Sequence, residues 1–159
     1  MAGARPRGFT LVEALVAVSV ASVLLSTAAP SFMRSMARGR IEGQANELAV
    51  DLQYARSESV RRRALATVAV ADGGGAYTLS YQNPVTGQNV VLKTVAMPTT
   101  VSINATAPIV FDPLRGMANA VTLQLTSSQL TERLRILTNA SGRLQLCSPD
   151  GAFRGFPTC

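Results

Sequence analysis

Histidine and tryptophan are both missing from this chain of 159 residues. Without histidine, the sequence lacks the usual general base and the commonest metal ligand of proteins. It also contains no nucleophile elbow and no phosphate-binding loop, and its acidic residues are scattered singly. We therefore expect no enzyme activity, no cofactor and no metal site. Without tryptophan, the core must be built mainly from valine, leucine, isoleucine and alanine.

Cysteine is also scarce, because only Cys147 and Cys159 occur, both close to the C-terminal end of the sequence. In an oxidising compartment, the pair predicts one disulfide that closes a C-terminal loop and contributes about 3 kcal/mol. The alternative interpretation is two free thiols.

The longest run with almost no charge lies near the N-terminus. Residues 1–8 carry Arg5 and Arg7 and no acid, and residues 9–29 are 21 residues with one charge, that of Glu13. About 20 apolar residues are enough for a helix to span the hydrocarbon core of a membrane. A carboxylate inside such a segment costs about 2.5–3.5 kcal/mol, so Glu13 needs a partner or a task.

The junction Gly8-Phe9-Thr10-Leu11-Val12-Glu13 resembles the type IV prepilin signal shared by pilins and the pseudopilins of type II secretion. The resemblance implies that a membrane prepilin peptidase cuts between Gly8 and Phe9 and methylates Phe9. Glu13 could then pair with the new amino group of Phe9 on a neighbouring subunit, so that two membrane charges become one neutral pair. The alternatives are an ordinary secretory signal cut near residues 27–29, or a plain single-span anchor.

A helical period follows the apolar run. Apolar residues recur at steps of four and three, while charged residues lie off this stripe. The stripe consists of Ile41, Ala45, Leu48, Leu52 and Ala55, and the charged positions are Glu42, Glu47, Asp51, Arg56 and Glu58. No proline falls between Ser31 and Asn83, which predicts one helix from about residue 10 to about residue 62. Residues 61–63 are three arginines, interpreted as a helix stop or alternatively as a phosphate-binding patch.

Beyond residue 64 the pattern changes to short strands separated by glycine and proline turns. The expected strands are Ala64–Ala71, Ala76–Gln82, Val90–Met97, Val101–Ala105, Ile109–Phe111, Val121–Thr126, Leu134–Thr138 and Arg143–Cys147. This predicts an α+β fold of the type IV pilin-like kind, with a mostly antiparallel sheet on the helix stripe. The expected parts are a leader (1–8), a membrane and assembly helix (9–29), its amphipathic continuation (30–63) and a β-rich domain (64–159).

Three further segments narrow the resemblance to the GspH/FimT family of type II secretion pseudopilins and type IV minor pilins. They are LQYARSESVRRRA at the helix end, IVFDPLRGMA, and NASGRLQLC before the first cysteine. The family is one of non-enzymatic fibre subunits. Some members take part in DNA uptake through a basic Gly-Arg-x-Arg pattern; here Gly142 and Arg143 match its first half, but Gln145 replaces the second arginine.

A phosphate-contacting patch would have to come from the C-terminal arginines. The candidates are Arg133, Arg135, Arg143 and Arg154. A few such cations would bind DNA in a strongly salt-dependent way. The alternative is that they are solvated arginines that keep strand edges soluble.

The sequence thus predicts a minor pilin or pseudopilin subunit. Its expected partners are prepilin peptidase, other pilin subunits and inner-membrane lipid, with DNA as the alternative ligand. The expected location is the bacterial inner membrane, crossed once, with the globular domain in the periplasm until the subunit joins a pilus or pseudopilus. The signal and stem are common to both fibres, so they do not separate the type IV pilus from the type II secretion system.

Overall fold

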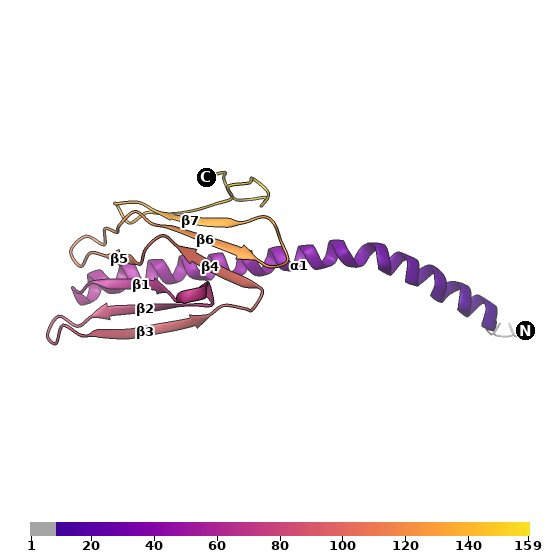
Figure 1. The fold of residues 1–159 in the computed structure, drawn as a ribbon, viewed down its shortest axis with the longest axis horizontal. Coiled ribbons are helices and arrows are strands. Elements are labelled where there is room, and N and C mark those ends of the chain that lie inside the picture. The colour runs from indigo at the N-terminus through magenta and orange to yellow at the C-terminus, as the bar shows by residue number, and fades with distance from the viewer. Residues whose placement is uncertain (1–8) are drawn as a thin grey trace, which may run out of the picture. The chain divides into compact units, whose positions relative to one another are not determined.

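The computed structural model describes residues 9–159, which form two units (Figure 1). One unit ends at Met36, and the other spans Ala37–Cys159. A single helix, α1 (Leu11–Arg62), contributes to both units, as the spacing of apolar residues predicted. The predicted cleavage site after Gly8, like the leader arginines Arg5 and Arg7, lies outside the described residues.

The second unit contains eight strands after α1. They are β1 (Ala66–Val70), β2 (Ala76–Gln82), β3 (Asn89–Ala96), β4 (Val101–Ala105), β5 (Ile109–Phe111), β6 (Thr122–Ser127), β7 (Leu134–Thr138) and β8 (Leu144–Cys147). Each predicted strand is present: β2, β4, β5 and β7 have the predicted ends, and the ends of the other four differ by at most two residues. A short 3₁₀ turn, η1 (Asp72–Gly74), joins β1 to β2.

The strands form two four-stranded sheets, in the orders β3-β2-β1-β5 and β4-β6-β7-β8 (Figure 1). Every pair of neighbouring strands in both sheets is antiparallel. Alternation of buried and half-buried residues along β6 and β7 shows that one face of each strand points into the core. The predicted α+β fold, a long helix packed on antiparallel strands, is confirmed, with the strands divided between two sheets.

The core of this unit lies between α1 and the two sheets. The predicted helix stripe, from Ile41 to Ala55, is buried, with each of its five apolar residues at most 1% exposed. It packs in one cluster with Tyr77 and Leu79 from one sheet and with Ile103 and Ile136 from the other. Burial of these side chains by all three layers is the main source of stability, since apolar surface removed from water is the dominant favourable term in folding.

The turn between β1 and β2 depends on glycine. Gly73 and Gly74 have φ angles of 80° and 70°, which residues with a side chain rarely adopt. A Cβ atom on Gly74 would also lie 2.2 Å from the carbonyl oxygen of Ile103, so the turn packs directly on the backbone of β4. Gly73 and Gly74 are thus suited to the hairpin turn, and Gly74 also to its contact with the other sheet.

Candidate assembly site

Thr10 and Glu13 form the N-terminal cap of α1. The backbone N–H of Glu13 donates to Oγ1 of Thr10 at 3.3 Å, which satisfies one of the donors left free at a helix start. Glu13 is the acidic residue of the first turn, where the helix dipole favours a negative charge. Its carboxylate is exposed and makes no ion pair with the described residues. The cap leaves this carboxylate available to a group from outside the subunit.

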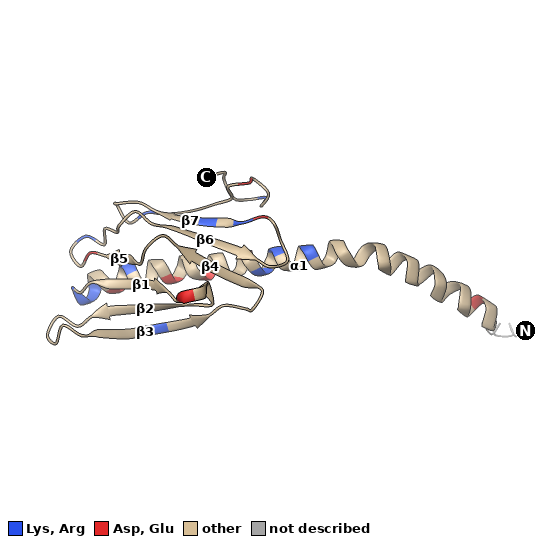
Figure 2. Ribbon diagram, in the orientation of Figure 1, with Lys and Arg blue, Asp and Glu red and all other residues tan. Residues whose placement is uncertain are grey.

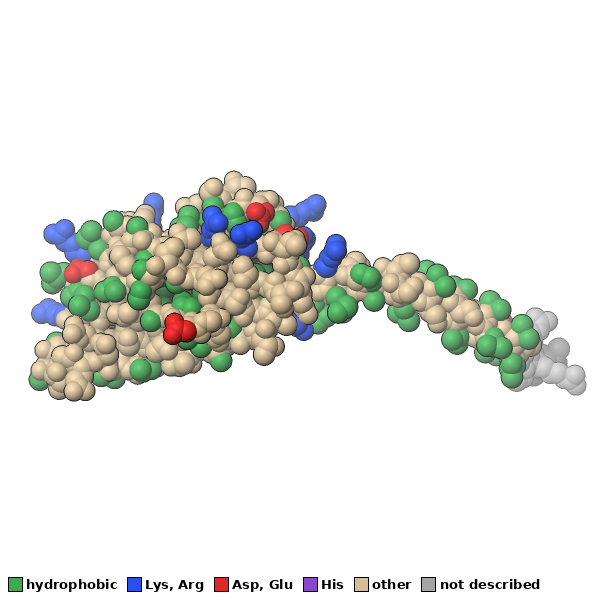
Figure 3. All heavy atoms as spheres, in the orientation of Figure 1, with side chains coloured by type: hydrophobic (Ala, Val, Ile, Leu, Met, Phe, Trp, Pro, Cys, Tyr) green, Lys and Arg blue, Asp and Glu red, His purple; other side chains and the backbone are tan. Residues whose placement is uncertain are grey.

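The first unit presents an apolar surface over most of its length. Phe9, Leu11, Leu24 and Leu25 are each between 63% and 78% exposed, and Figure 3 shows apolar side chains along the whole segment. Glu13 is its one acidic residue up to Met36, as the charge colouring of Figure 2 shows. By length and composition, α1 contains a segment able to cross a membrane. So large an exposed apolar surface requires a lipid or protein partner.

The hydroxyl side chains of this segment do not oppose burial in lipid. Five of them donate to a backbone carbonyl three or four residues earlier, at 2.8–2.9 Å: Ser19 to Leu15, Ser22 to Val18, Ser26 to Val23, Thr27 to Leu24, and Ser31 to Ala28. In hydrocarbon an unpaired polar group costs several kcal/mol, so satisfying hydroxyls within the helix removes that penalty. Between Ser19 and Ser31 the segment therefore presents no unpaired polar side chain to an apolar environment.

Asp51 connects the second half of α1 to two strands of one sheet. Oη of Tyr77 donates to its Oδ2 at 2.6 Å, and Nζ of Lys93 donates to both carboxylate oxygens at 2.9 and 2.7 Å. The hydrogen bond with Asp51 raises the pKa of Lys93, and burial together with Asp51 raises that of Tyr77. Glu47 lies further away, 3.6 Å from Lys93. In the sequence, Asp51 is a charged position off the apolar stripe, but in the structure it is buried. Burial is possible because Tyr77 and Lys93, which are distant in sequence, pair with its carboxylate.

Glu58 organises the C-terminal turn of α1. Its buried carboxylate accepts hydrogen bonds from Arg61 and Arg62, and the guanidinium of Arg62 lies 4.4 Å from the ring centroid of Tyr81. Arg63 then takes a φ of 51°, and the hydrogen bonds from the N–H groups of Arg63 and Ala64 close the helix in a Schellman motif. The arginine run is thus a helix stop, and two of its three charges are paired with Glu58.

We expect Glu58 to make stability dependent on acidic pH. The hydrogen bond with Arg61, and then that with Arg62, hold the pKa of the Glu58 carboxyl below its ordinary value of 4.5. A lowered folded-state pKa stabilises the fold above the unfolded-state pKa, and that contribution is lost as the pH falls through the folded-state value. Glu58→Gln should therefore reduce the fall in the free energy of unfolding of residues 37–159 between about pH 5 and pH 3.

Denaturant unfolding followed by circular dichroism at a series of pH values measures this effect. Glu42→Gln is the matched control, because Glu42 lies on the same helix and forms no ion pair with the described residues. The control should keep the pH dependence of the unchanged protein. If the free energy of unfolding depends on pH in the same way for Glu58→Gln and for the unchanged protein, Glu58 does not produce the acid sensitivity.

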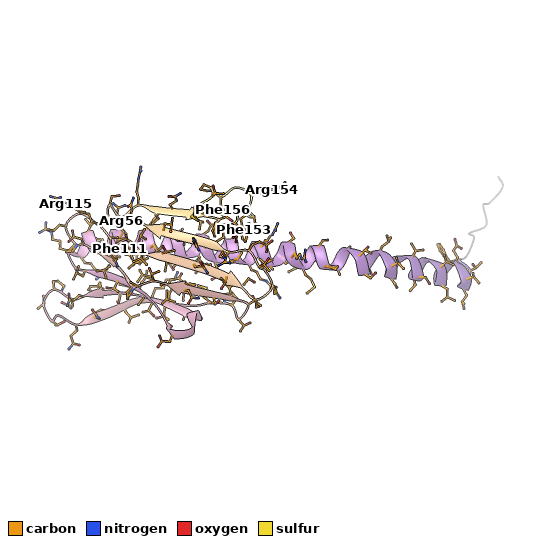
Figure 4. All side chains as sticks on the ribbon, turned by 45° about the horizontal axis from the view of Figure 1, so that its top comes forward. Arg56, Phe111, Arg115, Phe153, Arg154 and Phe156 are labelled. Atoms are coloured by element: carbon orange, nitrogen blue, oxygen red, sulfur yellow. A yellow bond between two sulfur atoms is a disulfide. The ribbon has the colours of Figure 1, made fainter. Side chains whose placement is uncertain are left out.

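Arg56 holds two loops of the second unit together. Its guanidinium donates to the carbonyl oxygens of Gly142 and Ser141 at 3.2 and 3.3 Å. Gly116 and Gly142 pack against it with φ angles of 61° and 72°, and a Cβ atom on Gly142 would lie 2.3 Å from the Gly116 carbonyl oxygen. Figure 4 shows Arg56 and Arg115 at one end of this unit. The three segments on which the sequence resemblance rests therefore meet in space, one contributing Arg56 and the others the two glycines.

Gly142→Ala is expected to destabilise residues 37–159 by at least about 2 kcal/mol, because it combines backbone strain with a clash. Gly87→Ala is the control: Gly87 has a similar φ of 70°, but a Cβ atom there would meet nothing within 4 Å. The control should lose only about 1 kcal/mol from strain. Thermal or denaturant unfolding measures both. Similar losses for the two variants would mean that the contact between the loops does not constrain Gly142.

A disulfide between Cys147 and Cys159 closes the C-terminal loop. The loop folds back on the unit: Phe153 is 2% exposed and belongs to the core cluster, and the guanidinium of Arg38 lies 6.0 Å from its ring centroid. Arg38 also donates to Glu132 at 2.7 Å, and this contact lowers the pKa of Glu132. The loop is therefore an integral part of the unit and is packed near the residues where α1 enters it.

The four arginines proposed to contact DNA lie at two different ends of β7 and β8. Arg133 forms an ion pair with Asp150 at 3.7 Å, and Arg135 is opposite Cys147 in the β-ladder and donates to Gln124. Arg143 precedes β8 at its other end, about 13 Å along the strand from Cys147 at ~3.3 Å per residue. Arg154 lies beside Phe153 and Phe156, away from Arg56 and Arg115 (Figure 4). The structure thus separates Arg143 from the other three.

Sequence reasoning did not single out Asp51, Arg56 or Arg115 as residues with a particular role. A buried acid within a helix has no local signature when its partners, Tyr77 and Lys93, lie 26 and 42 residues away. The one local signal for Arg56 was its place in a family-like segment together with the glycines at positions 116 and 142.

Comparisons with known proteins agree with this geometry. A family model described as "Type II transport protein GspH" matches residues 44–142, and a model of the prokaryotic N-terminal methylation motif matches residues 4–29. The minor pseudopilin EpsH from the type 2 secretion system of Vibrio cholerae has a similar structure, with a TM-score of 0.58 and 15% identity over 69% of this chain and 98% of that chain.

The type IV minor pilin FimU of Pseudomonas aeruginosa is also similar, with a TM-score of 0.57 and 24% identity over 73% of this chain and 97% of that chain. At these identities the two structures support the fold. Comparison with curated protein sequences found no match.

Proposed function

The chain belongs to the GspH family, and from this premise we propose that it is a fibre subunit, a minor pseudopilin or minor pilin that is processed by prepilin peptidase. The observation that carries the proposal is the N-terminal methylation motif at residues 4–29, whose described part coincides with the exposed apolar start of α1. A subunit of this kind acts by binding other subunits. Its role is structural and not catalytic.

In this proposal the peptidase hydrolyses the bond between Gly8 and Phe9 and then methylates the new amino group. The Glu13 carboxylate, exposed in the first turn of α1, pairs with the Phe9 amino group of a neighbouring subunit. Each charge alone is costly in hydrocarbon, whereas the pair is close to neutral. Assembly is therefore favoured only where two subunits meet in the correct register.

We place the apolar segment in the inner membrane, crossed once, with the globular unit in the periplasm. Arg5 and Arg7 in the leader favour a cytoplasmic N-terminus before processing. The Cys147–Cys159 disulfide fits an oxidising compartment such as the periplasm. The exposed apolar side chains of residues 9–29 contact lipid until the subunit enters the fibre.

The mass of the mature N-terminus, measured after expression in a host that has a prepilin peptidase, tests this proposal. We expect a chain that begins with methylated Phe9. Gly8→Leu should leave the leader attached, because a bulky side chain replaces the residue at the cut, while Gly3→Leu, elsewhere in the same leader, should be processed normally. A mature chain that begins near Pro30 would instead identify a secretory signal, and an intact N-terminus in the unchanged protein would identify a plain anchor.

DNA binding by the four C-terminal arginines is the less favoured function. Arg143 stands apart from Arg133 and Arg154, and Arg133 is paired with Asp150. Gln145 also replaces the second arginine of the basic pattern found in DNA-uptake pilins. Few free cations therefore remain close enough together to follow a phosphate backbone.

A further inference from the structure

An arginine-lined hollow lies at the end of the second unit where the two loops meet on α1. Its walls include Arg56, Ser57, Val60, Arg115, Arg143 and Leu144. Among the described residues, no acidic side chain lines this hollow. Three arginines, from α1, from the loop after β5 and from the start of β8, thus line one concave surface. We call this surface the arginine pocket.

The nearby acids are already engaged by other groups. The Asp112 carboxylate accepts hydrogen bonds from the backbone N–H groups of Leu114 and Arg115 at 3.0 Å, and Glu58 is paired with Arg61 and Arg62. Within the described part of the chain, Arg56, Arg115 and Arg143 form no ion pair. The arginine pocket therefore carries positive charge without an ion-pair partner among the described residues, which favours an anionic ligand.

Hydrogen bonds fix the backbone of Arg115 and Arg143, whose side chains are exposed. Oδ2 of Asp112 accepts a hydrogen bond from the backbone N–H of Arg115, and Oδ1 of Asn139 accepts one from the backbone N–H of Arg143 at 2.9 Å. Arg56 is itself held by its two hydrogen bonds to the loop carbonyls. The side chains of Arg115 and Arg143 donate no hydrogen bond to the other residues that the structure describes, and the paired donors of a guanidinium suit the two oxygens of a carboxylate or phosphate.

A second hollow adjoins the arginine pocket and shares Arg143 and Leu144 with it. It extends over the ends of β6, β7 and β8 and is lined by uncharged polar side chains, Thr106, Thr122, Asn139 and Gln145, together with Leu137. It adds no cation to those of the arginine pocket among the described residues. The two hollows together form a track longer than a single small anion needs.

The surroundings favour a polypeptide over a nucleic acid. Val60, which lines the arginine pocket, is 45% exposed, and Leu114 and Met117, in the same loop as Arg115, are 80% and 42% exposed. A duplex offers a regular row of phosphates and little apolar surface, so its binding calls for a row of cations, whereas this track has cations at one end only. A peptide with an acidic residue followed by small polar or apolar residues matches both parts of the track.

We propose that the arginine pocket binds a carboxylate-bearing segment of a partner protein, with the acidic side chain between Arg115 and Arg143 and the adjoining chain in the second hollow. This inference rests on the proposed function, because a fibre subunit must bind neighbours or cargo through its globular part. It assigns a specific surface and ligand chemistry to that contact.

The test uses the full chain in nonionic detergent and a fluorescent peptide in which glutamates alternate with valine and threonine. Anisotropy titrations at low and moderate salt give the affinity. Arg115→Gln/Arg143→Gln should weaken binding about tenfold or more, since it removes two charge-assisted contacts. The matched control, Arg133→Gln/Arg154→Gln, removes the same charge away from the pocket and should change the affinity less than about twofold.

Equal weakening by the two double variants, or no binding of the glutamate peptide, would overturn the proposal. Equal binding of a peptide with glutamine in place of glutamate would exclude carboxylate recognition. Tighter binding of short duplex DNA than of the peptide would exclude a polypeptide ligand. The same conclusion would follow if inorganic phosphate displaced the labelled peptide as effectively as unlabelled peptide does. An unprocessed N-terminus would overturn the proposed function while leaving this binding measurable, so the two failures are distinguishable.

Discussion

Asp51→Ala is expected to destabilise residues 37–159 by about 2–3 kcal/mol, mainly because the buried hydroxyl of Tyr77 loses its acceptor, while Lys93, 40% exposed, can be solvated. The substitution leaves Oη of Tyr77 without its acceptor in the core and removes the main counter-charge of Lys93. Such a loss is a large fraction of the 5–15 kcal/mol that stabilises a typical domain. Denaturant unfolding followed by circular dichroism measures it.

Glu47→Ala is the matched control, because Glu47 lies one helical turn earlier and also faces Lys93, but at 3.6 Å and with 43% of its side chain exposed. Exposed pairs of this kind contribute about 0–1 kcal/mol. Tyr77→Phe should have an intermediate effect, since it removes one hydrogen bond and keeps the ion pair. If Asp51→Ala and Glu47→Ala prove equally mild, Asp51 does not anchor α1 to the sheet.

Glu13→Gln is expected to reduce incorporation into the fibre by at least tenfold while leaving membrane insertion and N-terminal processing intact. The glutamine keeps the size of the side chain but cannot neutralise the amino group of a neighbouring Phe9, and breaking a buried ion pair costs about 3–5 kcal/mol. The measurement compares the amounts of processed subunit in sheared fibres and in the membrane fraction.

Ser19→Ala provides a control in the same apolar segment, because the Ser19 hydroxyl bonds only within its own helix. This variant should enter the fibre as the unchanged protein does. Normal incorporation of Glu13→Gln would reject the proposed pairing with the Phe9 amino group. Loss of processing in Glu13→Gln would instead assign the carboxylate to recognition by the peptidase.

The helix and strands could be predicted because their signals are local. The apolar stripe from Ile41 to Ala55 fixes a helical period, and the Asp-Gly-Gly-Gly turn separates two alternating segments. The family segments also predicted the pilin-like fold. The division of the strands into two sheets was not foreseen, because strand order depends on pairing between segments far apart in sequence, such as β1 with β5 and β4 with β6.

The candidate sites show the same limit. The N-terminal signal is a continuous stretch of sequence, so Glu13 could be singled out without a structure. Arg56 and Arg115 could not, because their significance comes from the meeting of α1, the loop after β5 and the loop before β8. The C-terminal arginines illustrate the converse: residues close in sequence, such as Arg135 and Arg143, lie at opposite ends of a strand pair.

The contacts along α1 have a mechanical consequence for a subunit under tension. Buried residues extend from Ala37 to Ser59, a rise of about 33 Å at 1.5 Å per residue. Within this length, side-chain bonds at Arg38, Asp51 and Arg56 attach the helix to three different parts of the unit. A pull along the helix axis loads these attachments in parallel, so they must shear together rather than break in turn. A fibre subunit built in this way resists extraction of its helix, and force spectroscopy should show one abrupt rupture.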